Sequence, residues 1–208
     1  FTLSVPDLTP ARSAIQAKSE ATFVEVGGQR ITGLTADTSY AESQLTFNAT
    51  GQDGKRQLSA AGSAIFHPDH QDIHLSSLAL KLEQITWSTP AGSEATFQYT
   101  PNRIGLEKLS LVNGDQRIDA DGVIGAANET LHVRASNVDV AQLDQLFLGD
   151  QRLAGRLTAD ANVSGSTTAP RAQGQFSLTH GAFRQFKFES FAGTVAYAGL
   201  GLKADGRR

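Results

Sequence analysis

The sequence predicts an all-β protein in which antiparallel strands follow one another in a long sheet, and two observations support this. Apolar and polar side chains alternate over much of the chain, most clearly from Gly155 to Gly206, with the two-residue period of a β-strand. The pattern of residues 45–62, alternating segments joined by a glycine turn, recurs in residues 109–122. Repeated units of this size stack on their neighbours, so we expect an array rather than a closed globule.

The N-terminal part predicts one short helix followed by a hairpin. Residues 1–5 alternate like a strand, and Thr9 followed by a proline fits the start of a helix that would run to Lys18. Residues 22–34 then alternate on both sides of Gly27-Gly28, and two glycines supply the positive φ angles of a tight turn. We therefore expect a β-hairpin there.

The next part predicts a second hairpin, a polar loop and a bulged strand. Residues 44–60 form the hairpin around a glycine-containing turn at 51–54, and residues 67–72 form the loop. Residues 73–82 alternate again, but the apolar positions change phase at Ser76-Ser77. Such a change of phase indicates a β-bulge or a corner.

One short helix is expected near residues 138–147. Either Asn137 or Asp139 can accept the free N–H groups of its first turn, and its apolar residues follow at helical spacing. A helix of two turns is marginal alone, so its apolar stripe must dock on the sheet or at one end of it. Beyond it, residues 155–206 predict short strands whose glycines mark turns, with a loop at Ala169-Pro170.

Composition excludes several classes of protein. The chain has 208 residues, is 39% hydrophobic, has a formal net charge of −3 and contains no Cys or Met. Without Cys there are no disulfides, no thiolate catalysis and no Cys-based zinc site. The basic residues are scattered singly, so no nucleic-acid surface is expected. The sequence contains no run of 18 apolar residues, which is the length that a membrane-spanning helix needs. The Phe at position 1 and the end in mid-pattern indicate a piece of a longer protein.

Polar clusters in the sequence favour a non-enzymatic protein without cofactor or metal. The residues of ligand type between positions 67 and 74 match no standard metal motif, and a polar loop is the favoured interpretation over a metal site; they are His67, Asp69, His70, Asp72 and His74. The carboxylates of Asp115, Asp119 and Asp121 alternate along a strand, which indicates its solvent face rather than an acid/base pair. No nucleophile elbow, phosphate loop or dinucleotide motif is present.

The strongest functional signal is the apolar face of the strands, for which an ordinary sandwich core remains an open interpretation. The segments that begin Val138-Asp-Val140-Ala-Gln-Leu143, Leu153-Ala-Gly155-Arg-Leu157 and Gly174-Gln-Phe176-Ser-Leu178 resemble the recurring unit of TamB-like (translocation and assembly module) proteins, within the wider AsmA-like group. The resemblance is best over residues 86–206. It is carried by a degenerate pattern that has no catalytic residue.

The resemblance implies that residues 1–208 form a single continuous segment of a periplasmic protein, anchored in the inner membrane by a helix outside this chain. Its curled sheet, antiparallel or mixed, would form an open, β-taco-like trough with an apolar concave face that conducts phospholipid acyl chains between the two membranes. A barrel protein of the outer membrane is an implied partner. The candidate lining residues are Trp87, Phe97, Tyr99, Ile104, Leu106, Leu109, Leu111, Ile118, Leu131, Val133, Leu157, Val163, Phe176, Leu178, Phe186, Phe188, Val195 and Tyr197. The alternative is a β scaffold that assists outer-membrane protein assembly by strand augmentation.

Overall fold

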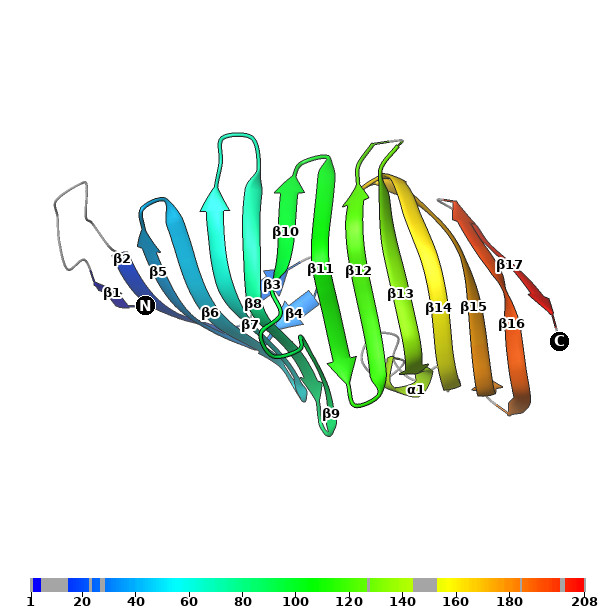
Figure 1. Ribbon diagram of the computed structural model, residues 1–208. Helices are drawn as coiled ribbons and strands as arrows, with labels where there is room; N and C mark the ends of the chain where they lie inside the picture. The colour runs from blue at the N-terminus through cyan, green and yellow to red at the C-terminus, as the bar shows by residue number, and fades with distance from the viewer. Residues whose placement is uncertain are drawn as a thin grey trace. The chain divides into compact units, whose positions relative to one another are not determined.

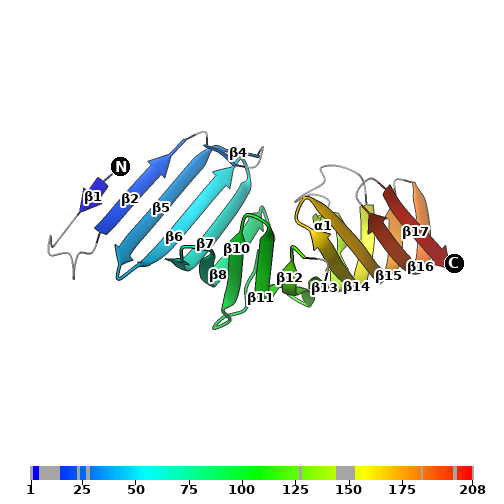
Figure 2. The same cartoon turned by 90° about the horizontal axis from the view of Figure 1, so that it is seen from above.

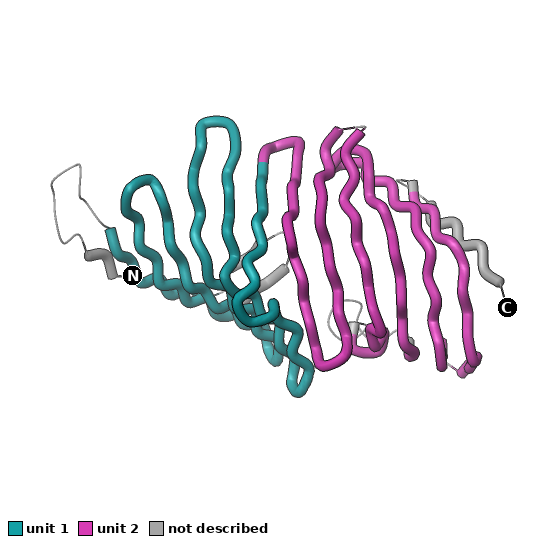
Figure 3. Tube along the Cα trace, in the orientation of Figure 1, with its two compact units in different colours: residues 1–99 teal, residues 100–208 magenta. Residues whose placement is uncertain are grey.

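The protein is all-β, as the alternation predicts, and its strands pair antiparallel (Figure 1). The computed structural model describes residues 2–4, 15–22, 24–26, 29–126, 128–143, 153–183, 185–198 and 201–207. It divides into two compact units, residues 1–99 and 100–208 (Figure 3). The single continuous trough over residues 1–208 stays a prediction.

Unit 1 is an antiparallel sheet with the order β1-β2-β5-β6-β7-β8-β10. The strand β9 pairs with the second half of β8, beside the half that pairs with β10, and β3 and β4 form a separate hairpin. The strands are β1 (Thr2–Ser4), β2 (Ile15–Ala21), β3 (Val24–Val26), β4 (Gln29–Ile31), β5 (Gly33–Ala41), β6 (Gln44–Asp53), β7 (Arg56–Phe66), β8 (Gln71–Leu82), β9 (Ile85–Ser88) and β10 (Ala95–Thr100).

Most of the expected elements of unit 1 are confirmed, and the first helix is wrong. Both predicted hairpins are present, as β3–β4 and β6–β7. The helix expected through Lys18 is instead strand from Ile15, because this segment alternates and pairs along its whole length with β5. The start of that predicted helix, residues 9–14, lies outside the described residues.

Unit 2 is an antiparallel sheet in which strands adjacent in sequence are also adjacent in space (Figure 2). It consists of β11 (Arg103–Asn113), β12 (Gln116–Ile124), β13 (Thr130–Asp139), the helix α1 (Val140–Leu143), β14 (Leu153–Ser166), β15 (Ala169–Phe183), β16 (Phe186–Ala198) and β17 (Gly201–Arg207). This order needs no crossover connections, so each hairpin adds its apolar face to the one before it.

The strands β14, β15 and β16 are longer than the glycine spacing predicts, at 14, 15 and 13 residues. Gly174 lies inside β15 rather than in a turn. Glycine is required there because a Cβ would come within 2.7 Å of the Cα of Ala161 on β14. Pro170, expected in a loop, pairs with Gly165, and the turn is at residues 167–168. Several glycines therefore serve close strand approach where the sequence suggested turns.

Bulges keep the apolar side chains of a strand on one face when the sequence changes phase. The phase change predicted at Ser76-Ser77 is confirmed: Ala61 of β7 pairs with Ser77, and the next residue of β7 pairs with Leu75, which leaves Ser76 as the extra residue. Comparable interruptions occur in unit 2 at three residues with positive φ, namely Lys108 (55°), Asn137 (51°) and His180 (50°). Each restores the face that simple alternation would lose.

The expected short helix is present but begins at Val140, and its cap is Asp139. The Asp139 carboxylate accepts a hydrogen bond from the Ala141 N–H at 3.0 Å. Val138, expected in the helix, belongs instead to β13, and the expected residues 144–147 lie outside the described residues. Gln142 accepts hydrogen bonds from Asn113 at 2.8 Å and Gln116 at 3.2 Å, which docks α1 at one end of the sheet.

Candidate functional site: an apolar sheet face

Three rows of paired residues cross unit 2 from β11 to β16, and their side chains are apolar or absent. Because residues opposite one another on paired strands share a face, each row is a continuous line of neighbours. The rows are Leu111, Ile118, Ala135, Ala159, Phe176 and Gly193; Leu109, Ala120, Val133, Ala161, Gly174 and Val195; and Leu106, Gly122, Leu131, Val163, Ala172 and Tyr197. We call this surface the apolar face of unit 2.

The apolar face of unit 2 is only partly covered. Among its described residues, the hydrophobic side chains that are buried are Ala120, Ile124 and Val138, of which only Val138 is fully buried, and the larger members of the rows are half-buried. Apart from α1 at one end, the described part of unit 2 contains no second layer over the sheet. A sandwich core would bury these side chains from both sides, so unit 2 by itself is a single-layer sheet with an accessible apolar face.

An aromatic cluster lies on this face, on β15 and β16 beside the bulge in the β14–β15 pairing. The rings of Phe176 and Phe191 have their centroids 5.5 Å apart, and those of Phe188 and Phe191 are 6.1 Å apart in an edge-to-face arrangement. The Phe188 ring lies over Gly181, where a Cβ would come within 2.2 Å of it. Phe191 was absent from the predicted lining, although its alternation with Val195 was a usable signal.

The register places the predicted lining residues on the apolar face of their own unit. In unit 2, Leu157 and Leu178 extend the rows, and Phe186 pairs with Phe183 beyond the bulge but is 67% exposed. In unit 1, Phe97 pairs with Ile73, whereas Trp87 pairs with Leu80. Tyr99 pairs with Gln71 and is exposed. Trp87 is 2% exposed and thus belongs to the core of unit 1 rather than to an open surface.

Unit 1 carries a matching apolar face. One of its rows consists of Ile15, Tyr40, Leu45, Ala64, Ile73 and Phe97, and the next of Ala17, Thr38, Phe47, Gly62, Leu75 and Ala95. The opposite side of the same strands presents polar residues such as Lys18 and Asp37, which form an exposed ion pair. Each unit therefore separates an apolar face from a polar one, as the alternation predicts.

The polar face of unit 2 holds a charged cluster and a shallow hollow. His132 Nε2 lies 2.7 Å from Asp160 Oδ1, and Arg134 donates to Asp160 Oδ2 at 3.2 Å. The hollow, of about 710 Å³, is lined by Arg134, Ser136, Thr158, Ala159, Asp160, Gln175, Phe176, Ser177, Ala192, Gly193 and Thr194. Because Arg134 and Ser136 line it and Ala135 does not, it opens on the polar face. The same face carries Asp119 and Asp121, whose predicted position on the solvent side is confirmed.

We expect Asp160 to titrate below an ordinary aspartate. The hydrogen bond from His132, followed by that from Arg134, lowers the pKa of Asp160. A lowered folded-state pKa means that this stabilisation is present above the unfolded-state value of about 3.9 and is lost as the pH falls through the folded-state value. Carboxyl NMR titration should show a midpoint for Asp160 that rises in His132→Ala. An unchanged midpoint would contradict the assigned cause.

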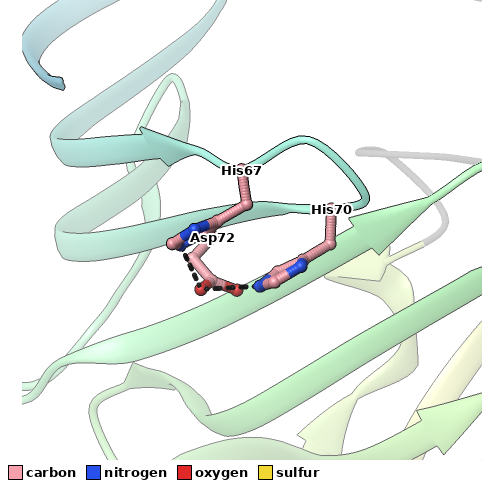
Figure 4. Close-up of side chains that lie close together, drawn as sticks. All are labelled: His67, His70 and Asp72. Carbon is pink, nitrogen blue, oxygen red and sulfur yellow. Dashed lines mark ion pairs between the residues drawn. The ribbon is translucent and has the colours of Figure 1, made fainter.

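Three of the five ligand-type residues between positions 67 and 74 come together in unit 1. The imidazoles of His67 and His70 and the carboxylate of Asp72 converge where β7 turns into β8 (Figure 4). Asp69 contacts His70, whereas His74 lies apart and contacts Thr96 at 3.3 Å. The sequence predicted a polar loop at residues 67–72; residues 67–70 are a loop, but Gln71 and Asp72 belong to β8, and spacing alone did not show this convergence.

Comparison of the chain with protein-family models, with curated proteins and with solved structures found no match. No helix among the described residues has the length and apolar character needed to cross a membrane. The TamB-like resemblance and the periplasmic location consequently stay expectations, and the apolar faces are the features from which a function is inferred.

Proposed function

We propose that this chain is a segment of a TamB-like periplasmic protein whose apolar sheet faces carry phospholipid acyl chains between the inner and outer membranes. The supporting observation is the accessible apolar face of unit 2, with rows that run unbroken from β11 to β16. The proposed role is non-enzymatic and uses no cofactor. It accounts for a sheet that keeps its apolar face through three bulges without covering it by a second layer.

The rows suit acyl chains because they offer the same environment at each strand. Exposure of an acyl chain to water costs on the order of 0.8 kcal/mol of free energy for each CH₂, so the chain needs apolar contact throughout its transfer. Neighbouring strands are about 4.8 Å apart, and the seven strands of unit 2 therefore span roughly 30 Å, against about 15 Å for one leaflet of hydrocarbon. Movement from strand to strand exchanges equivalent contacts, so the free energy stays nearly level. The headgroup remains in water.

Charge on the apolar face should abolish lipid binding, and charge on the opposite face of the same strand should not. We expect Phe176→Asp and Val195→Asp to lose the phospholipid that co-purifies with the periplasmically expressed chain, because an ionised carboxylate cannot be buried under an acyl chain without a partner. The measurement is native mass spectrometry of the chain, supported by crosslinking to a photoactivatable phospholipid.

Matched controls are available one residue away. Gln175 and Thr194 precede Phe176 and Val195 but lie on the polar face, where both line the hollow. Gln175→Asp and Thr194→Asp should keep the lipid, and circular dichroism should show strand content in all four variants. Lipid that persists in Phe176→Asp and Val195→Asp, or that is lost only from the two controls, would contradict the proposal.

Strand augmentation is the second candidate function, and the edge of β17 is the observation that favours it. Among the described residues of unit 2, β17 pairs only with β16, which leaves the backbone groups of its other edge able to pair with an added strand. Pairing of this kind depends on the backbone, so it is indifferent to charge at Phe176. A chain that carries no phospholipid in any of the four variants or in the parent would favour this alternative.

A further inference from the structure

We propose that His67, His70 and Asp72 form a binding site for a divalent transition metal of the zinc class. Their ligand atoms all lie within 4.8 Å of one another (Figure 4). His67 Nε2 and His70 Nε2 are each 3.4 Å from Asp72 Oδ2, so both imidazoles face one carboxylate oxygen. The site lies on the polar side of unit 1, because Asp72 pairs with Ile65 and Gln98 rather than with the apolar rows.

The spacing of the ligand atoms matches the requirements of a tetrahedral ion. With metal–nitrogen and metal–oxygen distances of about 2.0–2.2 Å, two ligands of a tetrahedral zinc ion are roughly 3.4 Å apart. Both His···Asp72 distances already have this value. The two rings are stacked with centroids 4.4 Å apart and an interplanar angle of 17°, so one imidazole must rotate out of the stack for both Nε2 lone pairs to point to the same metal. Water would complete the fourth position.

The surroundings of the three ligands are those that orient a metal site. Asp69 Oδ1 lies 2.8 Å from His70 Nδ1, a contact that fixes the tautomer with the Nε2 lone pair directed to the metal position. Gln98 donates to Asp72 Oδ1 at 3.2 Å and leaves Oδ2 as the ligating oxygen. The backbone N–H of His67 donates to the backbone carbonyl oxygen of His70 at 2.9 Å, which closes the turn that brings the two imidazoles together.

The ligand set also limits the class of metal. Two imidazole nitrogens and one carboxylate suit Zn²⁺, Ni²⁺ or Cu²⁺, whereas Mg²⁺ and Ca²⁺ prefer sites made wholly of oxygen. The purely polar interpretation of the loop leaves two stacked imidazoles that share a single carboxylate oxygen, whereas a metal would bind a nitrogen of each ring together with that oxygen.

Zinc titration of the 208-residue chain, expressed without a histidine tag and stripped of metal by a chelator, tests the site. We expect one Zn²⁺ per chain by isothermal titration calorimetry. The variants His67→Ala and His70→Ala should show no binding at zinc concentrations that saturate the parent. Asp69→Ala should retain the stoichiometry but bind about 10- to 100-fold more weakly, because it removes only the carboxylate that orients His70.

Two other histidines provide matched controls. His74 and His180 lie outside the cluster, so His74→Ala and His180→Ala should bind zinc as the parent does. Circular dichroism of each variant shows that the sheet is retained. Absence of binding by the parent, or binding that survives both His67→Ala and His70→Ala, would overturn the proposal. Neither result bears on the lipid experiment, since the zinc ligands are on the polar face of unit 1 and the lipid experiment changes residues of unit 2.

Discussion

Replacement of Trp87 by alanine is expected to destabilise the sheet of unit 1 by about 3–5 kcal/mol. Trp87 is the largest of the fully buried side chains among the described residues, with 2% of its surface exposed. It lies on β9, which pairs through only four residues with the second half of β8. So short a strand makes few backbone hydrogen bonds with β8, so burial of this side chain is a large part of what stabilises their pairing. Circular dichroism during urea unfolding should show the loss as a lower transition midpoint.

Trp87→Phe is the control that separates ring burial from the indole N–H. Within the described residues the buried Trp87 Nε1 has no hydrogen-bond partner, and phenylalanine removes this unpaired donor while it keeps most of the apolar contact. We therefore expect a much smaller loss than for alanine. Trp87 is the only tryptophan, so fluorescence cannot follow these variants. An alanine variant as stable as the parent would show that β9 does not depend on this ring.

Much of the fold was predictable from the sequence because period and phase are local properties. The alternation identified the strands and the phase change at Ser76 identified a bulge. The cap of α1 was narrowed to Asn137 or Asp139, and the structure shows that it is Asp139. The strand lengths were not predictable in the same way. Gly174 and Gly181 look like turn residues in sequence, but their role is to let a neighbouring strand or ring approach, which depends on residues of the adjacent strands.

For the candidate sites too, some properties were predictable from the sequence and others were not. The register placed the predicted lining on the apolar faces, because membership of a face follows from alternation once the bulges are known. The exposure of each lining residue could not be predicted from alternation. Trp87 is 2% exposed, and its pairing with Leu80 is known only from the structure. The approach of His67 and His70 was likewise hidden, because it depends on how the turn into β8 closes and on Gln98 from another strand.

The bulge in β8 explains why the apolar faces tolerate a sequence that changes phase. On β7, Leu58, Ala60, Gly62 and Ala64 keep a strict alternation, and they pair with Leu80, Leu78, Leu75 and Ile73 on β8. The extra residue, Ser76, turns its hydroxyl to the carbonyl oxygen of Ala61 at 3.1 Å. The two halves of β8 thus meet the same face, but only if β7 passes very close to β8 at this point.

Replacement of Gly62 by alanine is therefore expected to lower the free energy of unfolding by about 3 kcal/mol. A Cβ at Gly62 would lie 2.0 Å from the His74 carbonyl oxygen and 3.1 Å from the Cα of Leu75. Both are backbone atoms of β8, so the contact cannot be relieved by a change of rotamer. The strands must separate at the bulge, which would disturb the pairing on either side of Ser76. Urea unfolding and amide hydrogen exchange of β7 and β8 should both report the change.

Gly33→Ala is the matched control in the same unit. Gly33 is also a strand glycine, at the start of β5, but no atom lies within 4 Å of the position of its Cβ. Alanine there should be neutral or stabilise the chain by about 0.4–1 kcal/mol, because it reduces the conformational freedom of the unfolded chain without a contact to lose. Equal stabilities for the two variants would show that β7 and β8 have room to separate at the bulge, and the close approach of these strands would then not be what requires glycine at position 62.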